Sequence, residues 1–177
     1  MTKTKWTIDV SHSEVAFSVK HMMISKVKGS FNQFDAAIEA DPADLTTANI
    51  TFTVDVASVD TRSEDRDNHL RSADFFDVET YPTLTVISKK ITKTGDNEYE
   101  LIGDVSLHGV TREETFQVTF EGEAKDPWGN DKAGFSGSGK VKRSDYGLTW
   151  NTALETGGVL VGDQITLNFD IQAVKQA

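Results

Sequence analysis

Apolar and polar residues alternate along most of this chain, and this period of two residues is the feature that most limits its fold. The pattern is clear at residues 50–56 and 99–107, and again at residues 165–171 near the end. Such alternation places the apolar side chains on one face of a β-strand and the polar side chains on the other. The chain is therefore expected to be all-β.

The patterned stretches number eight or nine, and most are joined by short turns, at residues 41–44, 95–97, 108–110 and 127–131. Short connections join strands that run in opposite directions, because parallel strands need long crossovers. The order therefore predicts an antiparallel meander that is either closed into a barrel or folded as a sandwich.

Two stretches depart from the alternation. The inward positions change phase at Asn32 and Gln33, and one extra residue there would restore the phase, which predicts a β-bulge. Residues 61–81 begin with a charged run and then become apolar, which predicts a short helix capped at Ser63 or Thr61. A lone helix in an all-β chain is expected to cover one end of the strand body.

The chain has 177 residues, no cysteine, and a formal net charge of −10 from 18 basic and 28 acidic residues. A chain of this length buries enough surface to need no crosslinks, so residues 1–177 are expected to form a single domain. The acidic surface is expected to repel nucleic acid and anionic lipid headgroups, which argues against nucleic-acid binding. The lack of cysteine excludes disulfides, thiolate metal sites and cysteine nucleophiles.

No stretch approaches the roughly 20 apolar residues that a membrane-spanning helix needs. The first ten residues contain two lysines without a following apolar run, so no signal peptide is expected. As written, the chain is expected to stay in the cytoplasm, and export is expected only if a leader has been removed from the given sequence.

Glycines share the phase of the inward apolar residues at five positions, namely Gly29, Gly103, Gly122, Gly137 and Gly139. An inward glycine supplies no side chain, and eight strands can enclose one small ligand where the interior is not filled. The apolar walls then predict a cavity for a hydrophobic molecule. The alternative is that these glycines relieve strain at bends or bulges, and the spacing alone does not separate the two.

Several motifs, in their order and spacing along nearly the whole chain, resemble the YceI-like family. They are W-x-I-D-x-x-H-S from Trp6, V-x-F-x-V-x-H from Val15, S-V-D-T from Ser58, R-D-x-H-L from Arg66, D-F-F-D from Asp74, L-x-G-V-T from Leu107 and R-x-D-Y-G-L from Arg143. The resemblance implies a lipocalin-like, extended antiparallel β-barrel of about eight strands with a short helical cap. It also implies a long isoprenoid or other aliphatic chain in an interior tunnel, and a homodimer.

On this resemblance the chain is expected to bind, sequester or carry a polyisoprenoid, a quinone or a fatty chain, with no required cofactor. Together with the alternation it predicts these tunnel-lining residues: Phe17, Val19, Phe31, Ile50, Phe52, Val54, Leu70, Phe75, Phe76, Leu101, Val105, Phe116, Val118 and Phe135. The segment of Leu70, Phe75 and Phe76 is expected to close one end. Residues placed by the motifs to contact a polar head are His21, Arg66, Asp67 and His69.

Two other functions stay open at this point. The chain could be an enzyme acting on an isoprenoid or quinone, with His21 or His69 as the acid–base group, although the spacing shows no catalytic pair and no metal site. It could also be a dimeric, stress-related structural protein with an incidental cavity. In a structural interpretation His69 is a hydrogen-bonded lid residue. Arg66 and Asp67 then belong either to a solvated helix face of ion pairs with their charged neighbours, or to contacts that fix the helix to the barrel rim.

Overall fold

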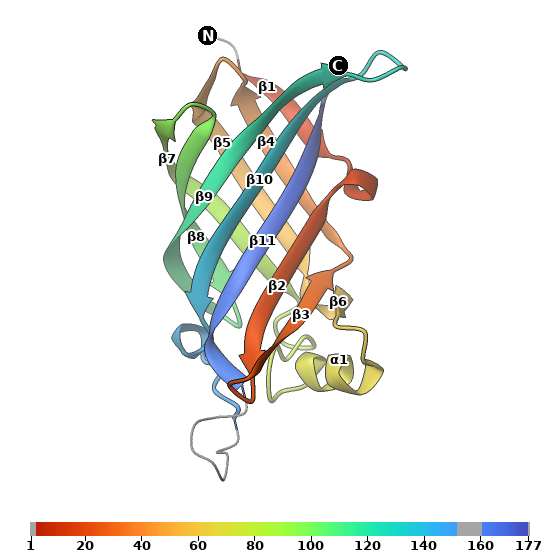
Figure 1. Ribbon diagram of the computed structural model, residues 1–177, viewed down its shortest axis with the longest axis vertical. Helices are drawn as coiled ribbons and strands as arrows, with labels where there is room; N and C mark the ends of the chain where they lie inside the picture. Colours follow the sequence, from red (N-terminus) through yellow and green to blue (C-terminus); the bar gives the residue numbers. More distant parts are fainter. Residues whose placement is uncertain (1–2, 152–160, 177) are drawn as a thin grey trace.

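The computed structural model describes residues 3–151 and 161–176, and antiparallel strands make up most of it (Figure 1). The described strands are β1 (Thr4–Ile8), β2 (Glu14–His21), β3 (Ser25–Phe31), β4 (Phe34–Asp41), β5 (Asp44–Asp55), β6 (Val59–Asp60), β7 (Thr83–Gly95), β8 (Glu98–Leu107), β9 (Val110–Lys125), β10 (Asp131–Lys142) and β11 (Val161–Lys175). The described helices are α1 (Glu64–Arg71) and the short 3-10 helices η1 (Val10–His12), η2 (Val56–Ser58) and η3 (Arg143–Tyr146).

Eight of the strands close into a ring. Their order is β1-β4-β5-β7-β8-β9-β10-β11, and β11 returns to β1 through the pairs Trp6–Lys175 and Ile8–Ala173. A closed ring leaves no unpaired edge, and all of the pairings in it are antiparallel. The expected lipocalin-like β-barrel with a short helix is therefore confirmed, and the sandwich is not formed.

Strand β11 is long enough to pair with two different strands along the same edge. Residues 173–175 of β11 pair with β1, while residues 161–170 pair with β2, and η1 lies between these two partners. Strand β2 then pairs with β3, and β3 pairs with β6. These strands extend the barrel toward α1, so the body is elongated with the chain termini at the opposite end (Figure 1).

The predicted β-bulge at Asn32 and Gln33 is wrong, because these residues separate two strands. Strand β3 pairs with β2 and β6, whereas β4 pairs with β1 and β5. The backbone at the break is held by η2 and its neighbours, since Asn32 N donates to Ser58 O (3.1 Å) and Asp55 N donates to Gln33 O (3.0 Å). The phase reverses because the chain leaves one part of the wall and begins another.

Helix α1 starts at the predicted place. The Ser63 hydroxyl caps it by accepting a hydrogen bond from Arg66 N (3.3 Å), whereas Thr61 anchors the helix from outside. The buried Asp67 carboxylate accepts hydrogen bonds from Thr61 N (2.9 Å) and Thr61 Oγ1 (2.5 Å). Farther along, Arg71 donates to the backbone of η2 and β6. The helix is thus fixed to the end of the barrel through backbone groups.

Inward glycines allow phenylalanine rings to lie flat on the neighbouring strand. Three glycines face a phenylalanine directly across the ladder, in the pairs Gly29–Phe17, Gly137–Phe169 and Gly139–Phe116. A Cβ atom added at Gly139 would lie 2.5 Å from Phe116 Cδ1, and one added at Gly29 would lie 2.5 Å from Phe17 Cζ. The space that each glycine leaves is therefore taken by a ring held against the wall.

Gly122 has the other role that the sequence allowed. It has a φ of +118° and lies beside a shift in the register between β9 and β10. A residue with a side chain rarely adopts such a backbone conformation, so glycine here relieves strain at a bulge.

Gly139→Ala is expected to destabilise the barrel, because the new methyl group overlaps the Phe116 ring and forces it off the strand. Overpacking of this kind costs about 1–3 kcal/mol, which urea unfolding monitored by circular dichroism would measure. The matched control is Gly95→Ala, where the nearest atom is the flexible Glu98 Oε2 at 3.1 Å. Equal losses in the two variants would contradict the role assigned to the ring.

Asp9 supports the seam at which β2 takes over from β1 along β11. Its carboxylate accepts hydrogen bonds from Ser11 N and Oγ, and lies 2.9 Å from Lys132 Nζ on β10 and 2.8 Å from His12 Nδ1. The Asp9 and Lys132 side chains are only 18% and 16% exposed. The hydrogen bonds from Ser11, and then those from Lys132 and His12, hold the pKa of Asp9 well below its usual range.

Asp9→Asn is expected to lower the free energy of unfolding at pH 7 by about 1–3 kcal/mol, since charge-assisted hydrogen bonds are lost. A carboxyl group with a lowered pKa in the folded state stabilises the fold above its unfolded pKa of about 3.9, and this contribution fades as the pH falls further. The difference between wild type and variant should therefore shrink below about pH 4. Urea midpoints across pH, with Asp96→Asn in an exposed turn as the control, measure this, and a difference that grows with acid would overturn it.

Candidate functional site

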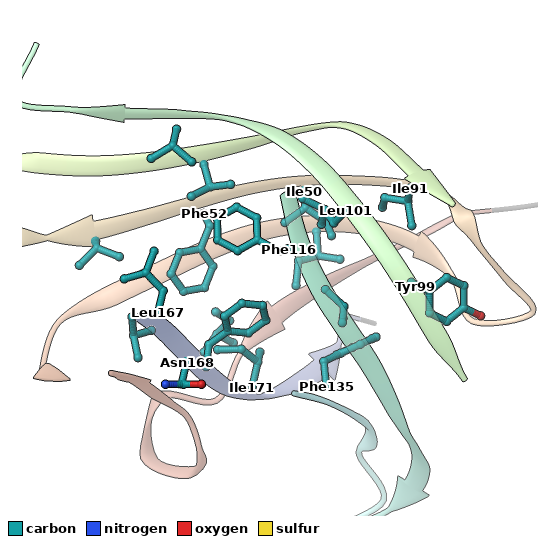
Figure 2. Close-up of a pocket in the computed structure, with 18 of the residues that line it drawn as sticks. Ile50, Phe52, Ile91, Tyr99, Leu101, Phe116, Phe135, Leu167, Asn168 and Ile171 are labelled. Atoms are coloured by element: carbon teal, nitrogen blue, oxygen red, sulfur yellow. The ribbon is translucent and has the colours of Figure 1, made fainter. Parts of the chain in front are cut away.

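An apolar cavity of about 170 Å³ lies inside the barrel (Figure 2). All eight strands of the ring contribute to its wall, together with β2 and β3. Two of the wall residues carry polar groups. Figure 2 shows the Tyr99 hydroxyl pointing away from the other labelled side chains, and Asn168 is an exposed residue of β11. The cavity can therefore bind an apolar group through van der Waals contacts and shape complementarity.

The accessibility of the inward side chains shows that the interior is not filled. Ile50, Phe52, Leu101, Val118 and Leu167 lie on the cavity wall, yet each is only partly buried. In a close-packed core such side chains would be covered by neighbours on the opposite wall. The rings that lie flat over glycines leave this central space open.

Two packed clusters of buried side chains surround the cavity. Near the chain termini the buried cluster comprises Trp6, Ala40, Leu45, Tyr99, Ala133 and Ala173. Toward α1 a second cluster includes Val56, Val59 and Tyr146, and the Phe76 ring meets the Phe31 ring at 6.0 Å between centroids. Both clusters contribute side chains to the wall itself.

Most of the predicted lining residues lie on this wall. They are Phe31, Ile50, Phe52, Val54, Leu101, Val105, Phe116, Val118 and Phe135. The wall also includes residues that the prediction left out, such as Leu167, Phe169 and Ile171 of β11. These three residues occupy inward positions of the same alternating pattern, so the sequence could have predicted them as lining residues. Contact of any of these residues with a ligand stays a prediction.

Five predicted lining residues lie off the cavity wall, toward the α1 end. The Phe17 ring covers Gly29 and packs on Phe31 at 5.4 Å, so it belongs to the packed cluster. Leu70 and Phe76 pack against the same cluster, while Phe75 is buried. The remaining one is Val19, which is half-buried near the end of β2. These residues are placed to close the barrel, which is the role expected for the segment of Leu70, Phe75 and Phe76.

The predicted head-group residues also lie outside the cavity wall. Arg66 and Asp67 are both bonded to Thr61, with Arg66 Nη2 at 2.6 Å from Thr61 O, which agrees with a role in fixing the helix. His69 Nε2 lies 2.9 Å from Asp74 Oδ2, and the His69 ring packs edge-on against aromatic neighbours. His21 is half-buried at the end of β2. Their contact with a ligand head stays a prediction.

Arg143 is a buried charge whose role the sequence reasoning missed, although it begins one of the quoted motifs. It is 6% exposed, and its guanidinium donates to Leu148 O (3.0 Å), Trp150 O (3.3 Å) and Gly162 O (2.9 Å). Burial lowers its pKa, and the charge of Asp163 opposes that shift. Arg143 thus joins the chain on both sides of residues 152–160, which lie outside the described residues.

Among residues 3–151 and 161–176, no group of three or more histidine, aspartate or glutamate side chains is arranged to hold a metal ion. In the same part of the chain, no helix is both long enough and apolar enough to cross a membrane.

Comparison with known proteins places the chain in a family. The model of the YceI-like domain matches residues 6–173. A UPF0312 protein of Staphylococcus epidermidis is 45% identical over 163 residues, which is 92% of each chain. Both matches cover almost the whole barrel, including the strands that line the cavity.

Solved structures agree with this assignment. BcnA of Burkholderia cenocepacia superposes with a TM-score of 0.82 at 27% identity, covering 93% of this chain and 98% of that one. A domain of Saccharophagus degradans described as polyisoprenoid-binding superposes with a TM-score of 0.73 at 15% identity, covering 97% and 98%, which shows a shared fold. The chain therefore belongs to the YceI-like family.

Proposed function

We propose that the barrel binds the apolar chain of a polyisoprenoid, a quinone or a fatty molecule, and so sequesters or carries it. The observation that carries this proposal is the cavity inside the closed ring, whose wall is built from aliphatic and aromatic side chains. Each buried methylene contributes about 0.8 kcal/mol, so ten carbons would contribute about 8 kcal/mol before ordering costs. No charged partner is needed to hold such a chain.

The size of the cavity determines what a long ligand must do. A cavity of about 150 Å³ in another protein admits benzene, so the 170 Å³ here admits only a short stretch of chain as it stands. A longer chain must push wall side chains aside. The partly buried rings of Phe52, Phe135 and Phe169 are the side chains that we expect to move, since each has unfilled space beside it.

The comparisons support the ligand class in part. The Saccharophagus degradans domain is described as polyisoprenoid-binding, and it shares the fold of this chain. At 15% identity this likeness concerns the fold alone, so the ligand of this chain is argued from its own cavity. A homodimer remains part of the proposal and is measurable by light scattering.

The alternative, that the chain is an enzyme, is less well supported, because the proposed acid–base histidines do not line the cavity. The His69–Asp74 pair has the hydrogen bond that an oriented acid–base histidine would need. Its ring, however, packs edge-on against Phe75 (5.0 Å) and Trp150 (4.7 Å), is 39% exposed to solvent, and lies off the cavity wall. His21 is likewise absent from the wall. We therefore assign His69 to holding the closed end together.

Val118→Trp is expected to reduce uptake of an apolar chain, because the indole ring fills the space beside a partly buried wall residue. Native mass spectrometry of protein from its own host, followed by organic extraction, would show a stoichiometric lipid on the wild type. Occupancy of the variant should fall about tenfold or more, since a 1.4 kcal/mol loss is tenfold in affinity.

Ile87→Trp is the matched control, because Ile87 lies on the outer face of β7 and is 50% exposed. It adds the same ring without touching the cavity and should keep the wild-type occupancy. A wild type that carries no lipid from its host, and that takes up no added polyprenyl or fatty chain, would refute the proposed function.

A further inference from the structure

Basic side chains gather on one outer face of the barrel although the chain as a whole is acidic. The register places Lys140, Thr166, Ser18 and Lys28 opposite one another across β10, β11, β2 and β3. Closer to the end of the β2–β3 hairpin, Lys142 lies opposite Gln164 and Lys20 lies opposite Lys26. We call the five exposed lysines Lys20, Lys26, Lys28, Lys140 and Lys142 the basic hairpin face.

Acidic residues of the same strands lie at the margins of this face. Asp170 of β11 lies opposite Ser136 and Glu14, two rows farther from the hairpin end. The row between them carries Ser138, Asn168, Ala16 and Ser30, and ends at Asp60 of β6. The nearest acid in sequence to the lysine rows is Asp163. Burial acts to raise the pKa of its carboxyl group, but hydrogen bonds from Ser144 and the charges of Arg143 and Lys142 lower it, so Asp163 interacts with one lysine of this face. Within the described residues, none of the five lysines forms an ion pair.

The loop that ends this hairpin is apolar and exposed. Met22, Met23 and Ile24 connect β2 to β3, and they are 44%, 52% and 83% exposed. Met22 and Met23 have φ angles of +54° and +64°, a conformation that favours asparagine or glycine. We call these three residues the apolar tip. Neither backbone geometry nor packing explains large apolar side chains at these positions.

We propose that the basic hairpin face and the apolar tip together dock on an anionic lipid membrane. The tip enters the headgroup layer, and the lysines behind it contact anionic headgroups, which is how interfacial segments bind membranes. An anionic surface also relieves the repulsion between Lys20 and Lys26, since like charges directly opposite on a sheet are unfavourable.

The net charge of −10 does not prevent this contact, because charges are screened beyond about 8 Å at physiological salt. The acidic residues of α1 lie at the same end of the barrel on a separate element (Figure 1). The exposed apolar tip favours lipid over nucleic acid, which offers no apolar layer for these side chains to enter. The proposal goes beyond ligand binding in the cavity and stands whether or not the cavity holds a lipid.

Flotation with vesicles tests the proposal on the whole chain with no ligand added. We expect the protein to float with vesicles of phosphatidylcholine and phosphatidylglycerol at about 0.15 M salt, and to remain unbound with phosphatidylcholine alone or at about 1 M salt. The variant K20E/K26E should reduce binding by about tenfold or more, because each lysine near an anionic surface contributes severalfold. The variant M22S/M23S/I24S should also reduce binding, through loss of the apolar contact.

Matched controls separate the surface from general charge and hydrophobicity. K90E/K93E makes the same change in charge at exposed lysines of β7, and W128S removes an 83% exposed apolar side chain at the β9–β10 turn. Both should bind vesicles as the wild type does. The proposal is overturned if the wild type ignores anionic vesicles, if the controls lose binding equally, or if the hairpin variants instead change the oligomeric state, which would make the tip a contact between copies.

Discussion

A closed ring of hydrogen-bonded strands allows this chain to leave its centre unfilled. Two stacked sheets are held together by the side chains between them, so an empty middle would remove the contacts that join the sheets. In this barrel the ladder between β1 and β11 completes the ring, and the Asp9–Lys132 contact supports the seam. The walls therefore keep their separation without meeting across the interior, and rings such as Phe116 can lie on Gly139 along the wall.

The two buried charged residues, Asp67 and Arg143, bond to the backbone near one end of the barrel. Asp67 accepts hydrogen bonds from Thr61, and Arg143 donates to carbonyl groups on both sides of residues 152–160. Neither forms an ion pair within the part of the chain that the structure describes, so each charge is satisfied by local peptide groups. This arrangement fixes α1 and the rim while the wall of the cavity stays apolar.

The alternation was sufficient to predict an all-β fold and most of the inward faces, because a period of two residues directly records which side of a strand a residue occupies. It does not record which strand lies alongside. The phase change at Asn32 looks the same whether a residue is inserted or a new strand begins, and only the pairing of β4 with β1 and β5 decides. The packing of Phe17 on Gly29 also depends on the register between two strands. The alternation alone could therefore not predict that Phe17 lies off the cavity wall.

The pairing of the strands also explains why the net charge of the whole chain, which is negative, did not predict the basic hairpin face. The lysines at residues 20–28 and 140–142 are far apart in sequence, and they form one face only because β11 lies between β10 and β2. The same strands serve the interior, since Leu167 and Phe169 of β11 line the cavity while Gln164 and Thr166 lie in the lysine rows outside. A strand in a barrel presents two independent surfaces at once. The same strands can therefore build both the apolar cavity and the basic outer face, because the inward side chains line the cavity and the outward side chains form the face.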